Sequence, residues 1–205
     1  SLQAGTGAPE ALAGRINDEK NRLKIDIVIE DTKAIIRESL EGMERIKKIV
    51  FDLKSFSHVD QDQSKPADIN ACLETTLSVV WNELKYKCTI QKHYGELPML
   101  ACNAGQLNQV FMNLLVNASQ AIDKQGTISI TTTHTNAPKQ ADGPGYITIS
   151  ISDTGCGIAP EKIGRIFEPF YTTKEVGLGT GLGLSISYDI VKKHNGDIRV
   201  QSEPG

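Results

Sequence analysis

Two stretches in which apolar and polar residues alternate, TISITTTHT and YITISISD, constrain the fold of this 205-residue chain more than any other feature. A period of two is the pattern of a β-strand that buries one face. The turn-rich linker NAPKQADGPG joins the two stretches, and consecutive strands joined in this way are expected to pair antiparallel. Helices predicted on either side in sequence would cover one face of the sheet. The pattern therefore predicts an α/β two-layer sandwich.

Further helices and strands are predicted throughout residues 66–205, and we find no internal repeat. Helical periodicity and flanking breakers predict helices over residues of about 70–85, 105–124, 160–166 and 181–195. Shorter apolar runs predict the strands CTIQKHY, PMLAC and DIRVQSE. Asp68 is expected to cap the first of these helices. We therefore expect a mixed, mostly antiparallel sheet packed against helices.

A long helix is predicted before this domain, from about Lys20 to Ser57. Apolar residues recur along it at intervals of three and four, and charged residues take the other face. Because one amphipathic helix cannot bury its own apolar stripe, this helix needs partner helices. Two interpretations stay open: a surface helix on the following domain, or part of an oligomeric helical bundle, which we favour.

The polar run HVDQDQSKPADIN interrupts the long helix and marks a domain boundary. Three segments follow from this boundary. Residues 1–19 are predicted to be a disordered stretch, a linker or a cloning scar, because they are rich in Gly, Ala and polar residues. Residues 20–60 form the helical segment, and residues 66–205 form the sandwich domain.

Charge and cysteine content argue against several classes of function. The net charge of −3 gives no electrostatic basis for binding nucleic acid or an anionic membrane. No apolar run approaches the roughly 18 residues that a membrane-spanning helix needs. The four cysteines have neither CxxC spacing nor a nearby His at zinc spacing. They are expected to be core or loop thiols in a reducing cytoplasm.

Two neutral amides, Asn113 and Asn117, lie four residues apart on the otherwise apolar helix NQVFMNLLVNASQAI. Side chains at i and i+4 share one helix face, so both amides point the same way. Taken alone, this pair has two interpretations. The amides satisfy neighbouring backbone groups, or they bind a polar ligand without acid–base chemistry of their own.

A glycine-rich turn, SDTGCGI, directly follows one of the predicted strands. Asp153 ends the strand, and Gly155 and Gly157 permit turns or a close ligand approach that a β-carbon would block. A carboxylate at a strand end can accept a hydrogen bond from an exocyclic amine such as that of adenine. The alternative is a simple Asp-Thr-Gly turn between a strand and a helix.

Two further motifs have residues suited to binding phosphate. In FEPFYTTK, Lys174 lies on a segment flanked by glycines, where it either contacts a phosphate as a point charge or is a solvated surface lysine. In GLGTGLGLSI, four glycines open a helix, and the N–H groups of a helix start together with its dipole form an anion site. The spacing matches neither GxGxxG after a strand nor GxxxxGK[ST].

The order and spacing of these four motifs resemble the N, G1, F and G2 boxes of bacterial sensor histidine kinases. The ending IVKKHNGDIRVQSEPG is similar to that family as well. The long helix ending in ERIKKIVFDLKSFS resembles the second helix of the family's dimerisation and histidine-phosphotransfer hairpin. The resemblance implies a Bergerat-type ATP-binding sandwich, preceded by a long α-helix from a helical bundle, that binds ATP and Mg²⁺ under a flexible lid.

The resemblance also implies roles for individual residues. Asp153 would bind the adenine amine, and Gly157 would shape the purine pocket. Asn117 would coordinate Mg²⁺ through its side-chain oxygen, which is sufficient because magnesium takes few protein ligands when phosphates supply the rest. Asn113, near the phosphates, and Lys174, near the terminal phosphate, would be the catalytic residues.

The glycine-rich segments would hold the phosphates. Residues 168–180 would form the lid, and the N–H groups of Gly181, Leu182 and Gly183 would face the phosphates. Further residues expected to contact the nucleotide are Gly155, Ile158, Phe167, Thr173, Gly179 and Thr180.

Asn113 separates this chain from other proteins with a similar ATP-binding fold. Chaperone, topoisomerase and mismatch-repair ATPases, and serine kinases related to mitochondrial dehydrogenase kinases, have Glu at this position as a general base. An amide takes no proton at neutral pH. A histidine acceptor is already a nucleophile as neutral imidazole, so Asn113 favours the histidine-kinase branch.

The chain departs from the family pattern in two places. The family's acceptor lies in a His-Glu/Asp-x-x-Asn/Thr-Pro context, which none of His58, His93, His134 and His194 has. These four are expected to be surface or packing residues, and the chain is predicted to bind ATP without phosphorylating itself. The family also continues beyond SEPG with a Gly-rich turn and a final strand, so an incomplete sheet or a truncated chain is expected.

The resemblance implies transfer of the γ-phosphoryl group of MgATP to a histidine outside this chain, then to an Asp of a response-regulator receiver domain. It implies a homodimer of the full-length protein through the hairpin, a cytoplasmic catalytic domain, and no contact of this part with nucleic acid or membrane. Two alternatives stay open. One is an ATPase or serine kinase of the same fold, and the other is an interaction module that uses ATP only as a ligand.

Overall fold

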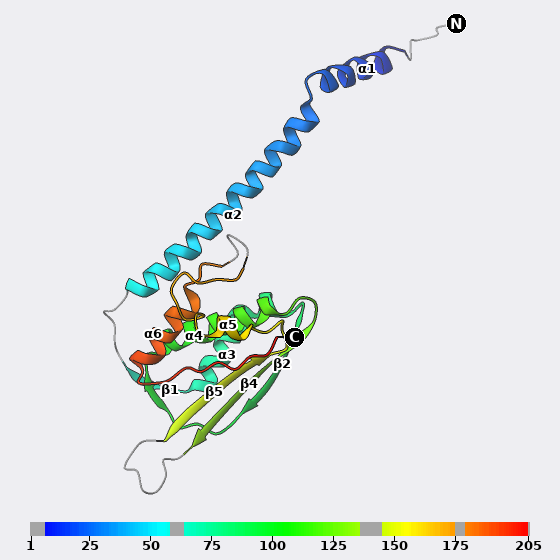
Figure 1. Cartoon of the computed structure of the whole chain (residues 1–205). Helices are drawn as coiled ribbons and strands as arrows, with labels where there is room; N and C mark the ends of the chain where they lie inside the picture. The colour runs from blue at the N-terminus through cyan, green and yellow to red at the C-terminus, as the bar shows by residue number, and fades with distance from the viewer. Residues whose placement is uncertain (1–6, 58–63, 136–144, 175–178, 205) are drawn as a thin grey trace. The chain divides into compact units, whose positions relative to one another are not determined.

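The structure is a computed structural model that describes residues 7–57, 64–135, 145–174 and 179–204 (Figure 1). The chain divides into two compact units, Ser1–Phe51 and Asp52–Gly205. Within the described residues, no helix combines the length and the hydropathy that crossing a membrane requires.

The first unit is helical. Helix α1 spans Gly7–Arg22 and helix α2 begins at Ile25 and continues to Ser57, with a break at Lys24, whose φ is 50°. Most of α1 lies where the sequence predicts a disordered stretch or linker; its Ala, Glu, Leu, Arg and Lys residues are strong helix formers, which explains the difference. The apolar stripe of α2 is exposed at Ile27, Val28, Ile29, Ile35, Ile36, Leu40, Met43 and Ile46.

The second unit contains a three-stranded sheet in the order β2–β4–β5, made of β2 (Cys88–Tyr94), β4 (Gly126–Thr135) and β5 (Tyr146–Asp153). Strands β4 and β5 are the two alternating stretches, and they pair antiparallel, as predicted, with Ile128 opposite Asp153. Strand β2 pairs parallel with β4. A second, two-stranded sheet joins β1 (Lys65–Ala67) and β3 (Leu100–Cys102) antiparallel.

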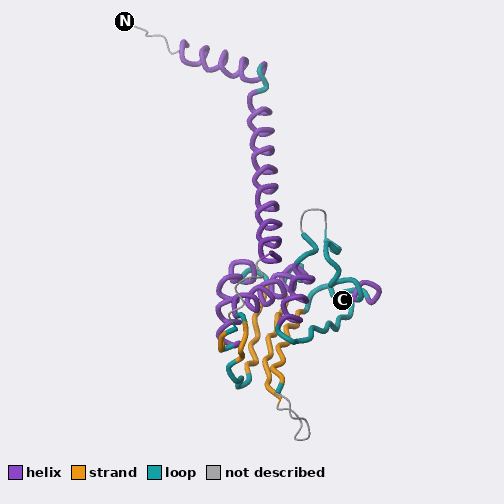
Figure 2. The backbone as a smooth tube through the Cα atoms, turned by 90° about the vertical axis from the view of Figure 1, so that its left-hand side faces the viewer, coloured by secondary structure: helices purple, strands orange, loops and turns teal. Residues whose placement is uncertain are grey.

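Four helices accompany the sheet: α3 (Ile69–Leu84), α4 (Ala104–Ala121), α5 (Pro160–Ile163) and α6 (Gly183–Lys193). Figures 1 and 2 show the helices on one side of the strand layer. The side chains of Ile128 and Ile130 on β4 are fully buried in the core, together with Leu73 of α3 and Leu115 of α4. These layers confirm the predicted sandwich.

Helix α3 begins where the sequence predicts it. The Asp68 carboxylate accepts hydrogen bonds from the backbone N–H groups of Asn70 at 2.9 Å and Ala71 at 3.2 Å. Such a cap satisfies donors that have no partner inside the helix. The prediction that Asp68 caps this helix is confirmed.

Hydrogen bonds that involve side chains hold both ends of helix α4. At its start, the Asn103 side chain accepts a hydrogen bond from the Gln106 N–H at 3.1 Å, and the Asn103 N–H donates to His194 Nε2 at 3.0 Å. At its end, Lys87 Nζ donates to the Ile122 carbonyl at 2.8 Å. These contacts fix the helix that carries both amides of the N-box motif.

The predicted strand DIRVQSE is wrong. Residues 196–204 have no regular secondary structure, although they follow α6 as an extended segment. Alternation gives a stretch the tendency to form a strand, but a strand also needs a neighbour that matches its hydrogen bonds in register. Among the described strands, β5 pairs with β4 and forms no ladder with this segment. Its Ser202 hydroxyl instead accepts a hydrogen bond from the Ile158 N–H at 2.9 Å.

Candidate functional site

Asn113 joins α4 to the start of α6. Its Nδ2 donates a hydrogen bond to the Gly183 carbonyl at 3.0 Å and a longer one to Ser187 Oγ at 3.3 Å. The fully buried Ser187 hydroxyl also donates to the Gly183 carbonyl, at 2.8 Å. Both interactions of Asn113 use the donor end of the amide. A carboxylate at this position would face the Gly183 carbonyl with no proton to share.

Asn117, one turn further along α4, presents its oxygen to a cation. Asn117 Oδ1 accepts a hydrogen bond from Lys174 Nζ at 3.0 Å. Gln120 Oε1 accepts a hydrogen bond from the same ammonium group. Lys174 therefore stands where two neutral amide oxygens converge. The two amides of the N-box motif differ in use, because Asn113 works as a donor and Asn117 as an acceptor.

The G1 motif lies against the last turn of α4. Asp153 ends β5, and one of its carboxylate oxygens, Oδ1, accepts a hydrogen bond from the Gly155 N–H at 2.9 Å. The Cys156 N–H donates to the Ala121 carbonyl at 3.0 Å. These contacts bring the strand-end carboxylate to the C-terminal end of the same helix that carries Asn117.

Gly157 turns the chain with a φ of +69°. A β-carbon there would lie 2.0 Å from the Glu203 carbonyl oxygen, so both the conformation and the space require glycine. The next residue, Ile158, donates its N–H to Ser202. Gly157 was expected to shape the purine pocket and Ile158 to contact the nucleotide, and the structure packs both of them against the C-terminal segment of the chain.

The F motif packs onto α6. The rings of Phe167 and Tyr188 lie 5.5 Å apart at an angle of 43°, so Phe167 contacts α6 as well as being a candidate nucleotide contact. Gly181 has a φ of +68°, and a β-carbon on it would lie 2.3 Å from the Phe170 carbonyl carbon. This close approach of two backbones requires glycine at 181. The F and G2 motifs therefore form one packed unit.

The predicted lid is described in part, because its residues 175–178 lie outside the described residues. Before that gap, Thr173 is exposed, and the Lys174 N–H donates to Thr172 Oγ1 at 3.2 Å. After it, Gly179 lies against the side chains of Thr172 and Lys174, and Thr180 Oγ1 accepts a hydrogen bond from the Leu182 N–H at 3.4 Å.

The start of α6 has the features of a helix N-terminus that can bind an anion. No side chain caps the helix, and the residue before its first turn, Leu182, is buried. The first N–H groups of a helix lack partners inside it, and the helix dipole adds partial positive charge there. Gly183 begins this turn beside Asn113, so a phosphate bound here would lie next to the N-box helix.

The family assignment rests on residues 102–205, which match the family described as "Histidine kinase-, DNA gyrase B-, and HSP90-like ATPase". This range includes all four motifs described above. The chain belongs to this ATPase family. The match confirms the predicted resemblance and the predicted ATP-binding fold.

Relatives of this ATPase chain include sensor kinases from several bacteria. The signal transduction histidine-protein kinase AtoS of Escherichia coli strain K12 is 35% identical over 96% of this chain. The sensory histidine kinase/phosphatase NtrB of Rhodobacter capsulatus is 33% identical over 97% of this chain. This chain spans 33% of AtoS and 54% of NtrB.

A solved structure supports the same fold. The mycobacterial sensor histidine kinase MprB matches with a TM-score of 0.54 and 25% identity, over 64% of this chain and 80% of that chain. The matched fold is therefore that of a histidine kinase as well as of the wider ATPase family.

The donor atoms around α4 fit a divalent cation that is shared with phosphates. Among the described residues, no three His, Cys, Asp or Glu side chains come together as a metal site. The Lys174 ammonium between Asn117 and Gln120 shows that the two amide oxygens accept a positive charge. Hard cations such as Mg²⁺ take oxygen ligands and need few from the protein when a nucleotide is present.

Sequence reasoning missed Gln120. Its spacing of three residues from Asn117 places both side chains on one face of α4, and this signal was present in the sequence. Glutamine is common on exposed helix surfaces, however, and its partner Lys174 lies 54 residues away. The contact therefore emerged only from the structure.

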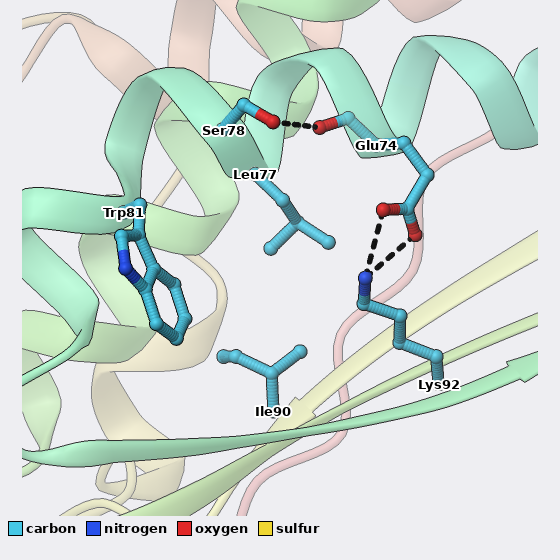
Figure 3. A pocket seen from close by; sticks show the side chains of 6 residues that line it. All are labelled: Glu74, Leu77, Ser78, Trp81, Ile90 and Lys92. Carbon is cyan, nitrogen blue, oxygen red and sulfur yellow. Dashed lines mark hydrogen bonds and ion pairs between the residues drawn. The ribbon is translucent and has the colours of Figure 1, made fainter.

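A separate pocket opens between α3 and β2 (Figure 3). Leu77, Trp81 and Ile90 line it, and the Glu74 carboxylate binds Lys92 Nζ at 2.8 Å at its edge. The hydrogen bond from Lys92 lowers the pKa of Glu74 below its ordinary value. The residues that line this pocket belong to none of the four motifs, so it is separate from the predicted nucleotide site.

Proposed function

We propose that this chain is the ATP-binding catalytic part of a sensor histidine kinase. It would hold MgATP so that the γ-phosphoryl group passes to a histidine outside this chain, for relay to an Asp of a response-regulator receiver domain. The observation that carries this proposal is the donor role of Asn113. A side chain that donates to the Gly183 carbonyl cannot serve as the general base that an ATPase needs towards water.

Each part of the site has a proposed task. Asp153 binds the adenine amine, and the first turn of α6 holds the phosphates through its N–H groups. Asn117 provides an oxygen ligand for Mg²⁺, which neutralises phosphate charge when bound. Lys174 approaches the terminal phosphate as a second positive charge. Catalysis then consists of positioning and charge neutralisation, as expected for phosphoryl transfer.

Asn113 has a positioning task in this scheme. Its two hydrogen bonds hold the Gly183 carbonyl and the Ser187 hydroxyl, and so fix the first turn of α6 against α4. The proposed phosphate-binding N–H groups are thereby held against the helix that carries Asn117. The remaining nucleotide contacts proposed from the sequence are Gly155, Gly157, Ile158, Phe167, Thr173, Gly179, Thr180, Gly181 and Leu182.

The proposed partners follow from the proposed reaction. The exposed apolar stripe of α2 fits a helical hairpin that dimerises with a second copy. The phosphoacceptor histidine would lie in the hairpin helix that precedes this chain, and the receiver domain would dock for the second transfer. Because the reaction consumes ATP, we place this part of the protein in the cytoplasm.

The test compares the 205-residue chain with a form extended upstream through the hairpin. Both are first titrated with ATP by calorimetry, with and without Mg²⁺, and then incubated with γ-labelled ATP. We expect both forms to bind ATP, and acid-labile phosphate to appear only on the extended form. Replacing the acceptor histidine by Gln should abolish the label.

Three results would contradict this function. Acid-labile phosphate on the 205-residue chain would place an acceptor within it. Continuous ATP hydrolysis by that chain, lost in Asn113→Ala, would favour an ATPase or serine kinase of the same fold. ATP binding by the extended form without any labelling would favour an interaction module that uses ATP only as a ligand.

A further inference from the structure

Three side chains form a cation-binding arrangement on the face of α4. Asn117 Oδ1 and Gln120 Oε1 converge on the Lys174 ammonium. The two amides are three residues apart, so they lie on one helix face, and the longer glutamine reaches back towards the position of the asparagine oxygen. The two oxygens therefore define a position for a positive charge.

The chemistry of this position suits two different cations. A primary ammonium donates hydrogen bonds to amide oxygens, and a divalent cation such as Mg²⁺ coordinates the same oxygens. Both cations cannot occupy one place, because like charges so close together repel strongly. Lys174 and a divalent cation must then compete for Asn117 and Gln120.

We propose that Gln120 is a second protein ligand of the divalent cation, and that Lys174 occupies the seat formed by Asn117 and Gln120 until a metal–nucleotide complex displaces it. The proposal rests on the nucleotide-binding function proposed above. Displacement frees Lys174 to pair with the terminal phosphate. The cation between the two amide oxygens thus changes from an ammonium group to a metal ion, and the charges in the site remain balanced.

The neutral amide at position 120 is what makes this exchange reversible. A carboxylate there would form a charge-assisted hydrogen bond with Lys174, roughly twice as strong as a neutral one, and would oppose its release. A lysine or arginine there would repel Lys174 from the seat. The glutamine oxygen forms a neutral hydrogen bond with the ammonium that is weak enough to break, and the same oxygen can coordinate a metal ion.

The experiment measures how much Mg²⁺ strengthens the binding of ADP to the 205-residue chain. This Mg²⁺ gain is the dissociation constant of ADP in EDTA divided by that in saturating Mg²⁺, both from calorimetry. ADP is used because it lacks the γ-phosphate with which Lys174 would otherwise pair. The variants are Lys174→Met, Gln120→Leu and the double variant, with the exposed residues Lys124→Met and Gln125→Leu as matched controls.

Removing the competing ammonium should raise the Mg²⁺ gain. We expect Lys174→Met to increase it at least about threefold, which corresponds to the low end of what a single hydrogen bond contributes. In the double variant, loss of the Gln120 oxygen should lower the gain at least about threefold below that of Lys174→Met. Gln120→Leu alone should have a smaller effect, because it removes a metal ligand and weakens the competitor together.

The inference is overturned if Lys174→Met leaves the Mg²⁺ gain unchanged or reduces it. It is also overturned if the double variant matches Lys174→Met, since Gln120 would then contact only the lysine. Unchanged thermal melting of each variant shows that it remains folded. Failure of the wild-type chain to bind ADP at all would instead contradict the proposed nucleotide function, so the two failures are distinguishable.

Discussion

Helices α4 and α2 are both amphipathic, but the apolar stripe of α4 is buried and that of α2 is exposed. In α4, Leu115 is 0% exposed and Phe111 2% exposed, because the sheet and neighbouring helices cover them. In α2, Ile35 is 62% exposed and Leu40 55% exposed. The spacing of apolar residues thus shows that a helix needs a partner, but it does not show where the partner comes from.

The two helices therefore differ in the source of their stability. The unit that contains α4 has a core of its own, with buried residues from α3, α4, α6, β2 and β4. The stripe of α2 is a long exposed apolar surface, which in a stable protein marks a contact with another molecule or segment. Mutations in the stripe of α4 should therefore change the free energy of folding, and mutations in the stripe of α2 should change association with a partner.

The largest effect is expected from matched leucine substitutions on the two helices. Leu115→Ala should lower the free energy of unfolding by about 2–5 kcal/mol, because it leaves a cavity in the core. Leu40→Ala should change it by no more than about 0.5 kcal/mol, because the side chain is largely exposed. Urea denaturation at low protein concentration measures both.

The contrast between the two helices is contradicted if Leu40→Ala lowers the free energy of unfolding by more than about 1 kcal/mol at low concentration, since α2 would then be stabilised within the monomer. Repeating the denaturation at high concentration sharpens it. A destabilisation by Leu40→Ala that grows with protein concentration would show that a second copy covers the stripe.

The second prediction separates the two amides of α4. Asn113→Asp replaces a donor to the Gly183 carbonyl by a carboxylate, and should cost roughly 1–3 kcal/mol. Asn117→Asp keeps the oxygen that Lys174 contacts, and should leave stability unchanged or slightly higher. Denaturation gives the energies, and hydrogen exchange of the α6 amides locates the change.

Equal costs for the two substitutions would contradict the assignment of one amide as donor and the other as acceptor. Exchange that accelerates in β2 or β4 as much as in α6 would show a global loss of packing, with no particular role for the Asn113 contact.

Much of the fold was predictable because its signals are local. The antiparallel pair β4–β5 follows from alternation and a turn, and the Asp68 cap follows from a residue type at a helix start. The family assignment follows from four motifs in a fixed order. In each case the deciding signal is a short stretch that can be recognised without knowing what it contacts.

What could not be predicted depends on partners far away in the chain. The donor role of Asn113 depends on Gly183, 70 residues later, and the contact of Gln120 depends on Lys174. Residues 197–203 alternate like a strand, yet they pair with none of the described strands. A sequence pattern shows what a segment can form, and long-range contacts decide what it does form.

The third prediction concerns His194, the histidine that joins the end of α6 to the start of α4. Its Nε2 accepts the Asn103 N–H at 3.0 Å, and its Nδ1 lies 2.8 Å from the Ile190 carbonyl. Loss of these bonds in His194→Ala should cost about 1 kcal/mol. The exposed His134 provides a control, because its substitution by Ala should cost less than about 0.5 kcal/mol.

The smallest effect concerns two exposed ion pairs, Lys92–Glu74 at 2.8 Å in the unit that contains α4 and Lys33–Glu30 at 2.7 Å on α2. The hydrogen bond from Lys92 lowers the pKa of Glu74 from its ordinary value of 4.5. A lowered carboxyl pKa stabilises the folded state above pH 4.5, and this contribution disappears as the pH falls through the lowered value.

Glu74→Gln should therefore lower the free energy of unfolding by less than about 1 kcal/mol at pH 7, as expected for an exposed pair. In acid, once the Glu74 carboxyl is protonated in both the folded and the unfolded state, the substitution should have no effect. Denaturation of wild type and variant from pH 7 to pH 3 measures how the difference in their free energies of unfolding decreases as the pH falls. Glu30→Gln should leave this global unfolding unchanged at every pH, because its pair lies outside the core-forming unit. If Glu30→Gln shifted the transition as much as Glu74→Gln, the two units would unfold together, and the stripe of α2 would contribute to the stability of the core after all.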